Sequence, residues 1–438
     1  MTQRAVVFDI TRLATRVSRP VPNGIDRVDI GYARHFLSHE RGGLGALLGP
    51  NGPRAVDNAA AADVVAMIER HWQETGQPDD DEIYRRVRAL LENDARSGPC
   101  ACPLIAMAAP AADARRSIAA LLRGTRVLGR SGLFPGRPMA ATAPEGAVYL
   151  NTCQFPLWID WYFRWLDRRP DMKAVFFIHD LLPIELPELF PAAEFKRHSR
   201  RMEVLARRAA GVIVASEQTR EALVDRLRAS GRVPPPIEVL PLPVDETFRA
   251  PATAPAWGRS RPYFVAVGTI EPRKNHLLLL NIWREIAERL GAATPRLLLV
   301  GLRGWENENV IDMLERCDRI RTSVTELRGI STPALRQLMA GARAVLLPTL
   351  AEGYGLPAAE AASAGVQLIA SHIGPFTAYR SDQAILLDPL DGPGWQCAIL
   401  AQLHGSMTTN STSPSSTERA LPTWAWHLKH ADDFIQSL

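Results

Sequence analysis

Two glutamates, Glu352 and Glu360, flank a short glycine-containing loop and the start of a helix. Gly353 and Gly355 allow the backbone to approach a ligand closely, and the free N–H groups of a helix start favour negative charge. Carboxylates do not bind phosphate, so these two must accept hydrogen bonds from hydroxyls if they serve a nucleotide sugar. The pattern predicts one site for phosphate and sugar hydroxyls. For Glu360 alone, an ordinary helix start with a favourable acidic residue is the alternative.

The elements around these glutamates must position them. An apolar run at residues 344–347 is typical of a buried parallel strand. After the glycine loop, Pro357 stands where the first turn of a helix tolerates proline. The helix covers residues 358–364 and ends at Gly365, and a second apolar run at 366–370 resumes the sheet. Strand, glycine loop, helix and strand form one half of a nucleotide-binding unit.

The stretch AEGYGLPAAEAASAGVQLIAS, residues 351–371, resembles the Glu-x7-Glu signature of the family-4 retaining glycosyltransferases. The similarity covers the C-terminal half well and the N-terminal half in patches, and Gln367 stands where a proline is common. The resemblance implies that Glu352 contacts the donor sugar and Glu360 the ribose. It also implies that the loop meets the sugar and the diphosphate through Gly353, Tyr354, Gly355 and Leu356.

A second loop, GTIEPRKN at residues 268–275, carries Arg273 and Lys274 directly after an expected strand. A diphosphate would sit at this position, and a surface basic pair is the alternative. By resemblance, Lys274 matches the phosphate lysine of the family. The family commonly has an arginine after the glycine that Gly268 represents, but here Thr269 follows. Arg273 would then supply the missing charge, and this loop would bind the donor.

The N-terminal half offers two further candidates. His179 follows an expected strand at residues 174–178, and ligands of open α/β sheets bind beyond such strand ends. A lone histidine is usually a packed polar residue, but this one resembles the family histidine that faces the donor sugar. Asn23 and Gly24 start a helix that could approach an anion or an acceptor, with Arg27 nearby. This stretch resembles the first loop of a bacterial subgroup, and a simple strand-to-helix turn is the alternative.

Strands and helices alternate on both sides of a proline- and alanine-rich linker within residues 241–262, which predicts two α/β units. The resemblance implies the GT-B fold: two Rossmann-like domains that face each other across a cleft. We expect an acceptor-binding domain at 1–247 with a helical insert at about 57–145, a nucleotide-sugar domain at 259–400, a mobile loop at 401–422 and a helix at 423–438 that docks on the first domain.

The insert region is the least informative part. A hairpin is expected around Asn51 and Gly52, and helices at 59–72 and 82–91. The acidic run at 79–81 contains an Asp-x-Asp, a metal motif of another glycosyltransferase architecture. Here it precedes a helix instead of ending a strand, which favours a solvated helix start. We therefore expect no metal site.

Composition excludes several classes. The 438 residues are 46% hydrophobic and 22% charged, and the net charge of +4 gives no reason to expect nucleic acid. Apolar runs are shorter than the ~18 residues of a membrane helix, and no signal-peptide pattern precedes the first strand. Five cysteines suggest reduced thiols and a cytoplasmic setting. Basic segments at 113–137 and 196–208 suit either an anionic membrane surface or ordinary solvated faces.

The resemblance implies retaining transfer of a sugar from a nucleotide diphosphate donor to a hydroxyl of a glycan or lipid-linked acceptor in bacterial polysaccharide synthesis, with no cofactor. The 268–275 loop resembles that of bacterial mannosyltransferases, so GDP-mannose is the first choice and UDP-glucose the second. No carboxylate is clearly placed as a nucleophile, which favours same-face attack. The alternatives are a related glucosyltransferase or epimerase, and a non-catalytic binding subunit. NAD-dependent oxidoreduction is not favoured, because the sequence lacks the G-x-G-x-x-G pattern after the first strand.

Overall fold

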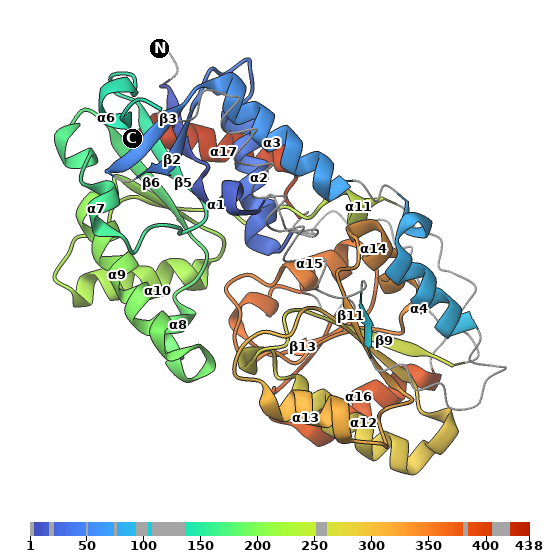
Figure 1. Cartoon of the computed structure of the whole chain (residues 1–438). Helices are drawn as coiled ribbons and strands as arrows, with labels where there is room; N and C mark the ends of the chain where they lie inside the picture. Colours follow the sequence, from blue (N-terminus) through green and yellow to red (C-terminus); the bar gives the residue numbers. More distant parts are fainter. Residues whose placement is uncertain are drawn as a thin grey trace, which may run out of the picture.

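The computed structural model describes residues 4–16, 22–49, 51–73, 77–92, 104–106, 136–250, 261–379, 384–404 and 421–438. These residues form two α/β domains, each with a seven-stranded sheet between two helical layers (Figure 1). Almost all of the basic segment 113–137, and most of the expected loop at 401–422, lie outside the described residues. No described helix is long and apolar enough to cross a membrane.

The first sheet has the strand order β3-β2-β1-β5-β6-β7-β8. All neighbours are parallel except β2 and β3, which form the expected hairpin around Asn51 and Gly52. Most of these strands are buried on both faces, which explains their continuous apolar runs. Their bounds are β1 Val6–Asp9, β2 Leu44–Gly49, β3 Gly52–Val56, β5 Val148–Asn151, β6 Lys173–Ile178, β7 Gly211–Val214 and β8 Ile237–Val239.

Two groups of helices cover this sheet. One apolar cluster joins it to the helices that begin and end the chain, and another joins it to the helices of residues 139–229. The first group is α1 Thr11–Arg16, α2 Gly24–Phe36, α3 Asn58–Gln73 and α17 Trp424–Ser437; the second includes α6 Met139–Thr142, α7 Asp160–Phe163, α9 Ala192–Arg208 and α10 Glu217–Ala229, with α8 Leu182–Glu185 packed against α9.

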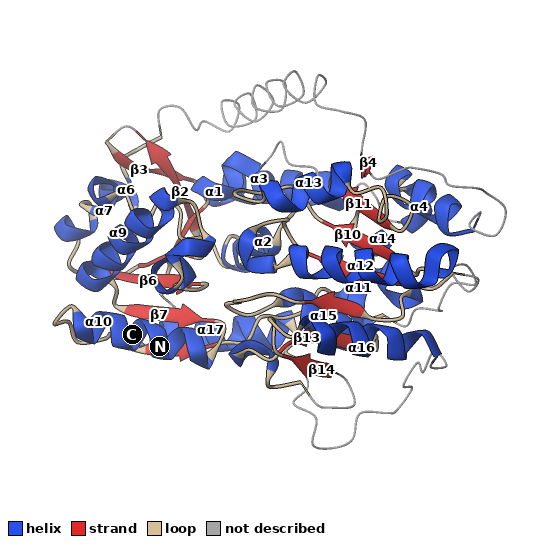
Figure 2. Cartoon of the chain, turned by 90° about the horizontal axis from the view of Figure 1, so that it is seen from below, coloured by secondary structure: helices blue, strands red, loops and turns tan. Residues whose placement is uncertain are grey.

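The second sheet has the order β14-β13-β12-β9-β10-β11-β4, and all its pairs are parallel. Helices again cover both faces (Figure 2). The strands are β9 Tyr263–Val267, β10 Arg296–Val300, β11 Val324–Arg328, β12 Val345–Leu347, β13 Leu368–Ser371, β14 Ala384–Leu387 and β4 Leu104–Ala106. The helices are α12 His276–Leu290, α13 Glu308–Arg316 and α16 Gly392–His404 on one face, and α4 Glu82–Glu92, α11 Glu246–Arg249, α14 Thr332–Gly341 and α15 Leu356–Ser363 on the other.

The placement of the insert corrects the expected domain boundary. Strand β4 pairs with β11 at the edge of the second sheet, and the apolar face of α4 joins the core of the same domain. Asp81 is buried, caps α4 and accepts a hydrogen bond from the Ser331 N–H at 2.7 Å. The insert was expected in the first domain, which is correct for α3 and α6 but wrong for α4 and β4. Of the acidic run, Asp79 and Asp80 are exposed, as a solvated helix start predicts, whereas Asp81 is buried. An apolar helical stripe predicts that a helix is covered, but not by which core.

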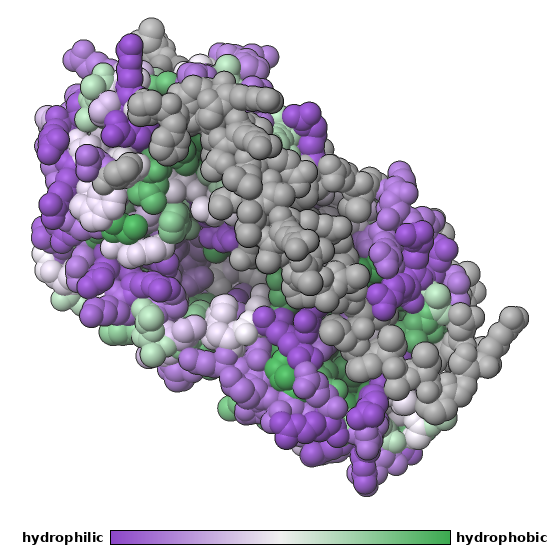
Figure 3. Space-filling model, in the orientation of Figure 1, coloured by the Kyte–Doolittle hydropathy of each residue, from purple (hydrophilic) through white to green (hydrophobic). Residues whose placement is uncertain are grey.

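Helix α17 packs on the first domain, as the resemblance to the family implied (Figure 1). The Trp424 ring lies so close to α2 that a Cβ on Gly31 would approach it to 2.5 Å. The Tyr32 hydroxyl and the His427 Nε2 are hydrogen-bonded at 2.8 Å. Trp426 lies on the same helix and is 42% exposed. The face of the molecule in Figure 3 is largely hydrophilic, with small apolar patches over both domains.

Candidate active site

The strand order of the second sheet reverses direction at β9, the position where ligands of open α/β sheets bind. The chain proceeds from β9 to β10 on one side and reaches β12 on the other, so loops from neighbouring strands diverge at their carboxyl ends. The loop after β9 carries Arg273 and Lys274, and the loop after β12 carries Glu352. The Arg273 carbonyl joins the two loops, because it accepts hydrogen bonds from the Leu350 N–H at 2.7 Å and the Thr349 hydroxyl at 2.9 Å.

Glu352 lies between the two predicted cations. Its Oε2 is 2.7 Å from Arg273 Nη1, and its Oε1 accepts a hydrogen bond from Lys274 Nζ. Burial alone would raise the pKa of Glu352, but the two cations hold it below its ordinary value. Burial lowers the pKa of Lys274, against the opposing effect of Glu352. The site therefore contains an ionised carboxylate that is fixed at both oxygens.

The local structure requires glycine at two positions of the loop after β12, for a different reason at each. Gly355 has φ 84° and precedes α15, a conformation that side chains rarely adopt. A Cβ on Gly353 would lie 2.6 Å from the His179 carbonyl oxygen and 2.8 Å from the Asp180 Cβ. The loop after β12 is therefore in close contact with the loop after β6 of the other domain.

The loop after β9 is also tight. Gly268 has φ 148°, and a Cβ there would lie 3.1 Å from the Lys274 Cε, so the glycine leaves room for the lysine side chain. The Thr269 methyl group packs at Gly304, where an added Cβ would approach it to 2.7 Å. Of the four candidate residues in this loop, the structure brings Arg273 and Lys274 to Glu352, while Gly268 and Thr269 shape the backbone.

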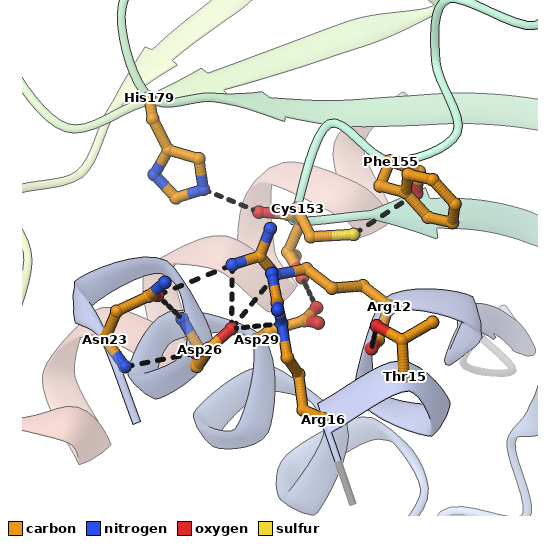
Figure 4. Close-up of polar contacts among 10 residues, drawn as sticks. Arg12, Thr15, Arg16, Asn23, Asp26, Asp29, Cys153, Phe155 and His179 are labelled. Atoms are coloured by element: carbon orange, nitrogen blue, oxygen red, sulfur yellow. Dashed lines mark hydrogen bonds and ion pairs between the residues drawn. The ribbon is translucent and has the colours of Figure 1, made fainter. Parts of the chain in front are cut away.

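His179 lies beyond the end of β6, on the side of the candidate site that the first domain forms; we call this side the opposite wall. The His179 Nε2 donates a hydrogen bond to the Thr152 carbonyl oxygen at 2.8 Å (Figure 4). The centroids of the His179 and Phe177 rings are 4.7 Å apart. Burial lowers the pKa of His179 to about 4. The imidazole is therefore neutral at pH 7, with its proton on Nε2 and an acceptor at Nδ1.

A buried carboxyl fixes the segment that orients this histidine. The Thr152 hydroxyl donates a hydrogen bond to Asp29 Oδ1 at 2.6 Å, and both residues are fully buried. The other oxygen, Asp29 Oδ2, has no partner among the described residues. Burial raises the pKa of Asp29 to about 7. Asp29 from α2 thus connects through Thr152 to the ring of His179.

The predicted anion loop forms the base of this wall (Figure 4). The Asn23 side chain accepts from the Asp26 N–H at 2.9 Å, and the Asn23 N–H donates to Asp26 Oδ2 at 3.1 Å. Arg12 and Arg16 both approach Asp26 Oδ1, at 2.7 and 3.2 Å. Asn23 therefore caps α2, and the simple helix-start alternative accounts for its side chain.

Other contacts hold the two domains together at the candidate site. The Ser216 hydroxyl donates to the Gly353 carbonyl at 2.8 Å, and the Tyr354 hydroxyl donates to the Leu242 carbonyl at 2.9 Å. Leu356 packs into the core of the first domain, and its Cδ1 would lie 3.2 Å from a Cβ on Gly24. Arg27 donates from Nη1 to Glu360 Oε1. Arg27 and Gly24 thus contact the predicted donor loop and its helix.

Sequence reasoning missed several residues of this site. Glu271 is buried and its Oε1 lies 2.7 Å from Arg273 Nε; an acid beside two bases within 268–275 was a usable signal. Asp29 and Thr152 had none, because they lie 123 positions apart.

The chain is similar to known proteins in sequence and in fold. Residues 261–404 match the family described as Glycosyl transferases group 1. O-antigen chain mannosyltransferase B of Escherichia coli is 26% identical over 261 residues, which cover 57% of this chain and 65% of that protein. Serotype-specific mannosyltransferase WbdA of Escherichia coli is 27% identical over 228 residues, 48% of this chain and 27% of that protein. The chain thus spans less than two thirds of these relatives.

A solved structure described as "Trehalose-6-phosphate from E. coli bound with UDP-2-fluoro glucose" superimposes with a TM-score of 0.54. The match covers 99% of this chain and 95% of that one, at 14% sequence identity. This similarity confirms the predicted fold class, two Rossmann-like domains in the GT-B arrangement. The comparisons therefore show the fold of the chain and its similarity to glycosyltransferases over part of its length.

Proposed function

We propose that the protein is a retaining glycosyltransferase that moves a sugar from a nucleotide diphosphate to a hydroxyl of a glycan or lipid-linked acceptor in bacterial polysaccharide synthesis. The observation that carries this proposal is the group formed by Arg273, Lys274 and Glu352 at the switch point of the second sheet. Cations and a glycine loop meet there at the start of a helix, opposite a neutral histidine.

The residues suit the departure of a diphosphate. Negative charge develops on the leaving group, and Arg273, Lys274 and the N–H groups at the start of α15 are placed to stabilise it. Glu352 holds both cations and can accept a hydrogen bond from a sugar hydroxyl. His179 Nδ1 can accept another from the opposite wall. We propose that the reaction needs no metal and that the acceptor attacks the same face that the diphosphate leaves.

GDP-mannose is the proposed donor, because the matched relatives named above are mannosyltransferases. UDP-glucose is second, since a solved structure of the same fold is described with UDP-2-fluoro glucose. A panel of nucleotide sugars, scored for donor hydrolysis and for thermal stabilisation of the protein, tests both. We expect the largest stabilisation from GDP-mannose. Stronger stabilisation by UDP than by GDP reverses the order, and a protein that binds none of the donors is a non-catalytic subunit.

We also propose that the enzyme reaches a lipid-linked acceptor at an anionic membrane surface. The basic segment 196–208 belongs to α9, but part of its charge is compensated: Arg197 pairs with Glu194, and Arg208 with Asp160 and Asp167. We therefore expect weak, salt-sensitive binding. Co-sedimentation with anionic and neutral liposomes across salt measures it. Equal, negligible binding to both contradicts the membrane proposal.

A further inference from the structure

One ion pair joins the two domains at the candidate donor site. Arg27, on α2 of the first domain, donates from Nη1 to Glu360 Oε1, on α15 of the second. Its Nη2 donates to the Thr332 hydroxyl at 3.2 Å. Glu360 is 3% exposed and the Arg27 side chain 20% exposed, so the pair is largely shielded from water. A shielded pair interacts more strongly than an exposed one, and breaking it leaves a buried charge without its partner.

The surroundings of Glu360 make Arg27 important for its charge. Burial raises the pKa of Glu360, Arg27 opposes this rise, and Asp245 before α11 adds to it. Tyr379 also faces Glu360, and burial raises the pKa of that phenol, so it stays neutral. Among these groups Arg27 is the cation. Its removal would raise the pKa of Glu360 further, because the buried carboxylate would lose its cation.

The geometry assigns Arg27 as a positioning residue: it holds Glu360 deprotonated and oriented, so that Glu360 accepts hydrogen bonds from the ribose hydroxyls of a nucleoside diphosphate. Arg27 engages Oε1, while Oε2 has no hydrogen-bond partner among the described residues. The donor site is then completed by a side chain of the first domain. This inference rests on the proposed function, because Glu360 must serve a nucleotide sugar.

The test compares nucleotides with and without ribose hydroxyls. The full-length protein and its R27A variant are titrated calorimetrically with GDP and with 2′,3′-dideoxy-GDP at pH 6 and pH 8.5, and with the corresponding uridine nucleotides. We expect R27A to weaken GDP binding by about tenfold or more at pH 6 and by less at pH 8.5, because a higher pH favours the ionised carboxylate. The dideoxy nucleotide should bind to both proteins within about twofold.

Two controls separate this role from a fold defect. T332V removes the second partner of Arg27 but leaves Glu360 paired, and it should bind GDP within about twofold of the wild type. In the E360Q background there is no charge to maintain, so adding R27A should change GDP affinity by less than about twofold. R27K keeps the charge and should recover most of the affinity that R27A loses.

Three outcomes overturn the inference alone: equal weakening of GDP and dideoxy-GDP, equal weakening at both pH values, or no change in R27A. A wild-type protein that binds neither guanosine nor uridine diphosphate contradicts the proposed function, and the inference falls with it.

Discussion

The two sides of the candidate site, one from each domain, differ in how their charges are arranged. In the second domain, Glu352 is held ionised between Arg273 and Lys274. In the first domain, His179 is neutral at pH 7, and burial raises the pKa of Asp29 toward neutrality. The wall of the second domain carries a carboxylate whose charge is balanced by two cations. The wall of the first domain carries hydrogen-bonding groups that are largely uncharged. The first suits a diphosphate, and the second suits sugar hydroxyls.

The largest effect on activity is expected when the cations of the second domain's wall are removed. Replacing Arg273 and Lys274 together by alanine should lower kcat/KM by about 10²-fold or more, because two charges that stabilise the leaving group are lost. The variant also leaves Glu352 buried without a cation, which costs on the order of 3–5 kcal/mol of stability. Steady-state kinetics and urea unfolding measure the two effects.

Adding E352Q to that double variant is the matched control, because it removes the buried charge. It should restore stability without restoring activity. Wild-type turnover in the double variant would show that these cations do not stabilise the leaving group.

A second prediction concerns the uncharged wall. The pKa of Asp29 rises from 3.8 to about 7 on folding, so the native state retains a proton that the unfolded chain releases between those values. Stability contributed by Asp29 therefore falls as pH rises through this window. D29N keeps an oxygen for Thr152 and does not titrate. Its stability relative to wild type should increase by on the order of 3 kcal/mol from pH 4 to pH 8.

Urea-unfolding free energies at several pH values measure this difference. Parallel curves for D29N and wild type would mean that Asp29 ionises in the fold as readily as in the unfolded chain.

A third prediction tests the neutral histidine. H179A should lower kcat/KM by about tenfold, the size expected for one lost hydrogen bond to a substrate. Because burial lowers the pKa of His179 to about 4, its protonation should produce no acid limb near pH 6.5 in the wild-type profile. Rates measured from pH 5.5 to 8 in both proteins check this. An acid limb near 6.5 that H179A abolishes would mean that the histidine titrates in contact with water.

The smallest expected effect is that of chelation. If the second wall supplies the positive charge through its own side chains, EDTA should change kcat by less than about twofold. Complete loss of activity, restored by Mg²⁺ or Mn²⁺, would mean that the leaving group depends on a metal and that Arg273 and Lys274 have another role.

The same contrast explains what the sequence could predict. Residues 268–275 and 352–360 are short segments whose glycines, charges and flanking strands indicated a phosphate and hydroxyl site, and the sheet order brings them together. The link from Asp29 through Thr152 to His179 joins three distant segments. No local pattern records such contacts, because they depend on which loops meet at a strand end.

Elements were more predictable than their partners. The hairpin at β2 and β3, the helices α3 and α4, and the α15 unit lie where periodicity and turn residues indicated. The core that receives α4 was not predictable, since its apolar stripe would suit either domain. Trp426 shows the opposite limit: a helix can dock through Leu428 and Ile435 and still expose a tryptophan.

The segments exchanged between the domains have a consequence for biosynthesis. Strand β4 is made early but pairs with β11, and α17, the last helix, covers the sheet that begins with β1. A nascent chain that has completed the first sheet still lacks the helix that covers it, and β4 has no sheet to join. The first sheet is therefore covered only after Trp424–Ser437 has been made, and β4 is paired only after β11 has been made. Long-range pairings of this kind slow folding and leave edges exposed in the meantime.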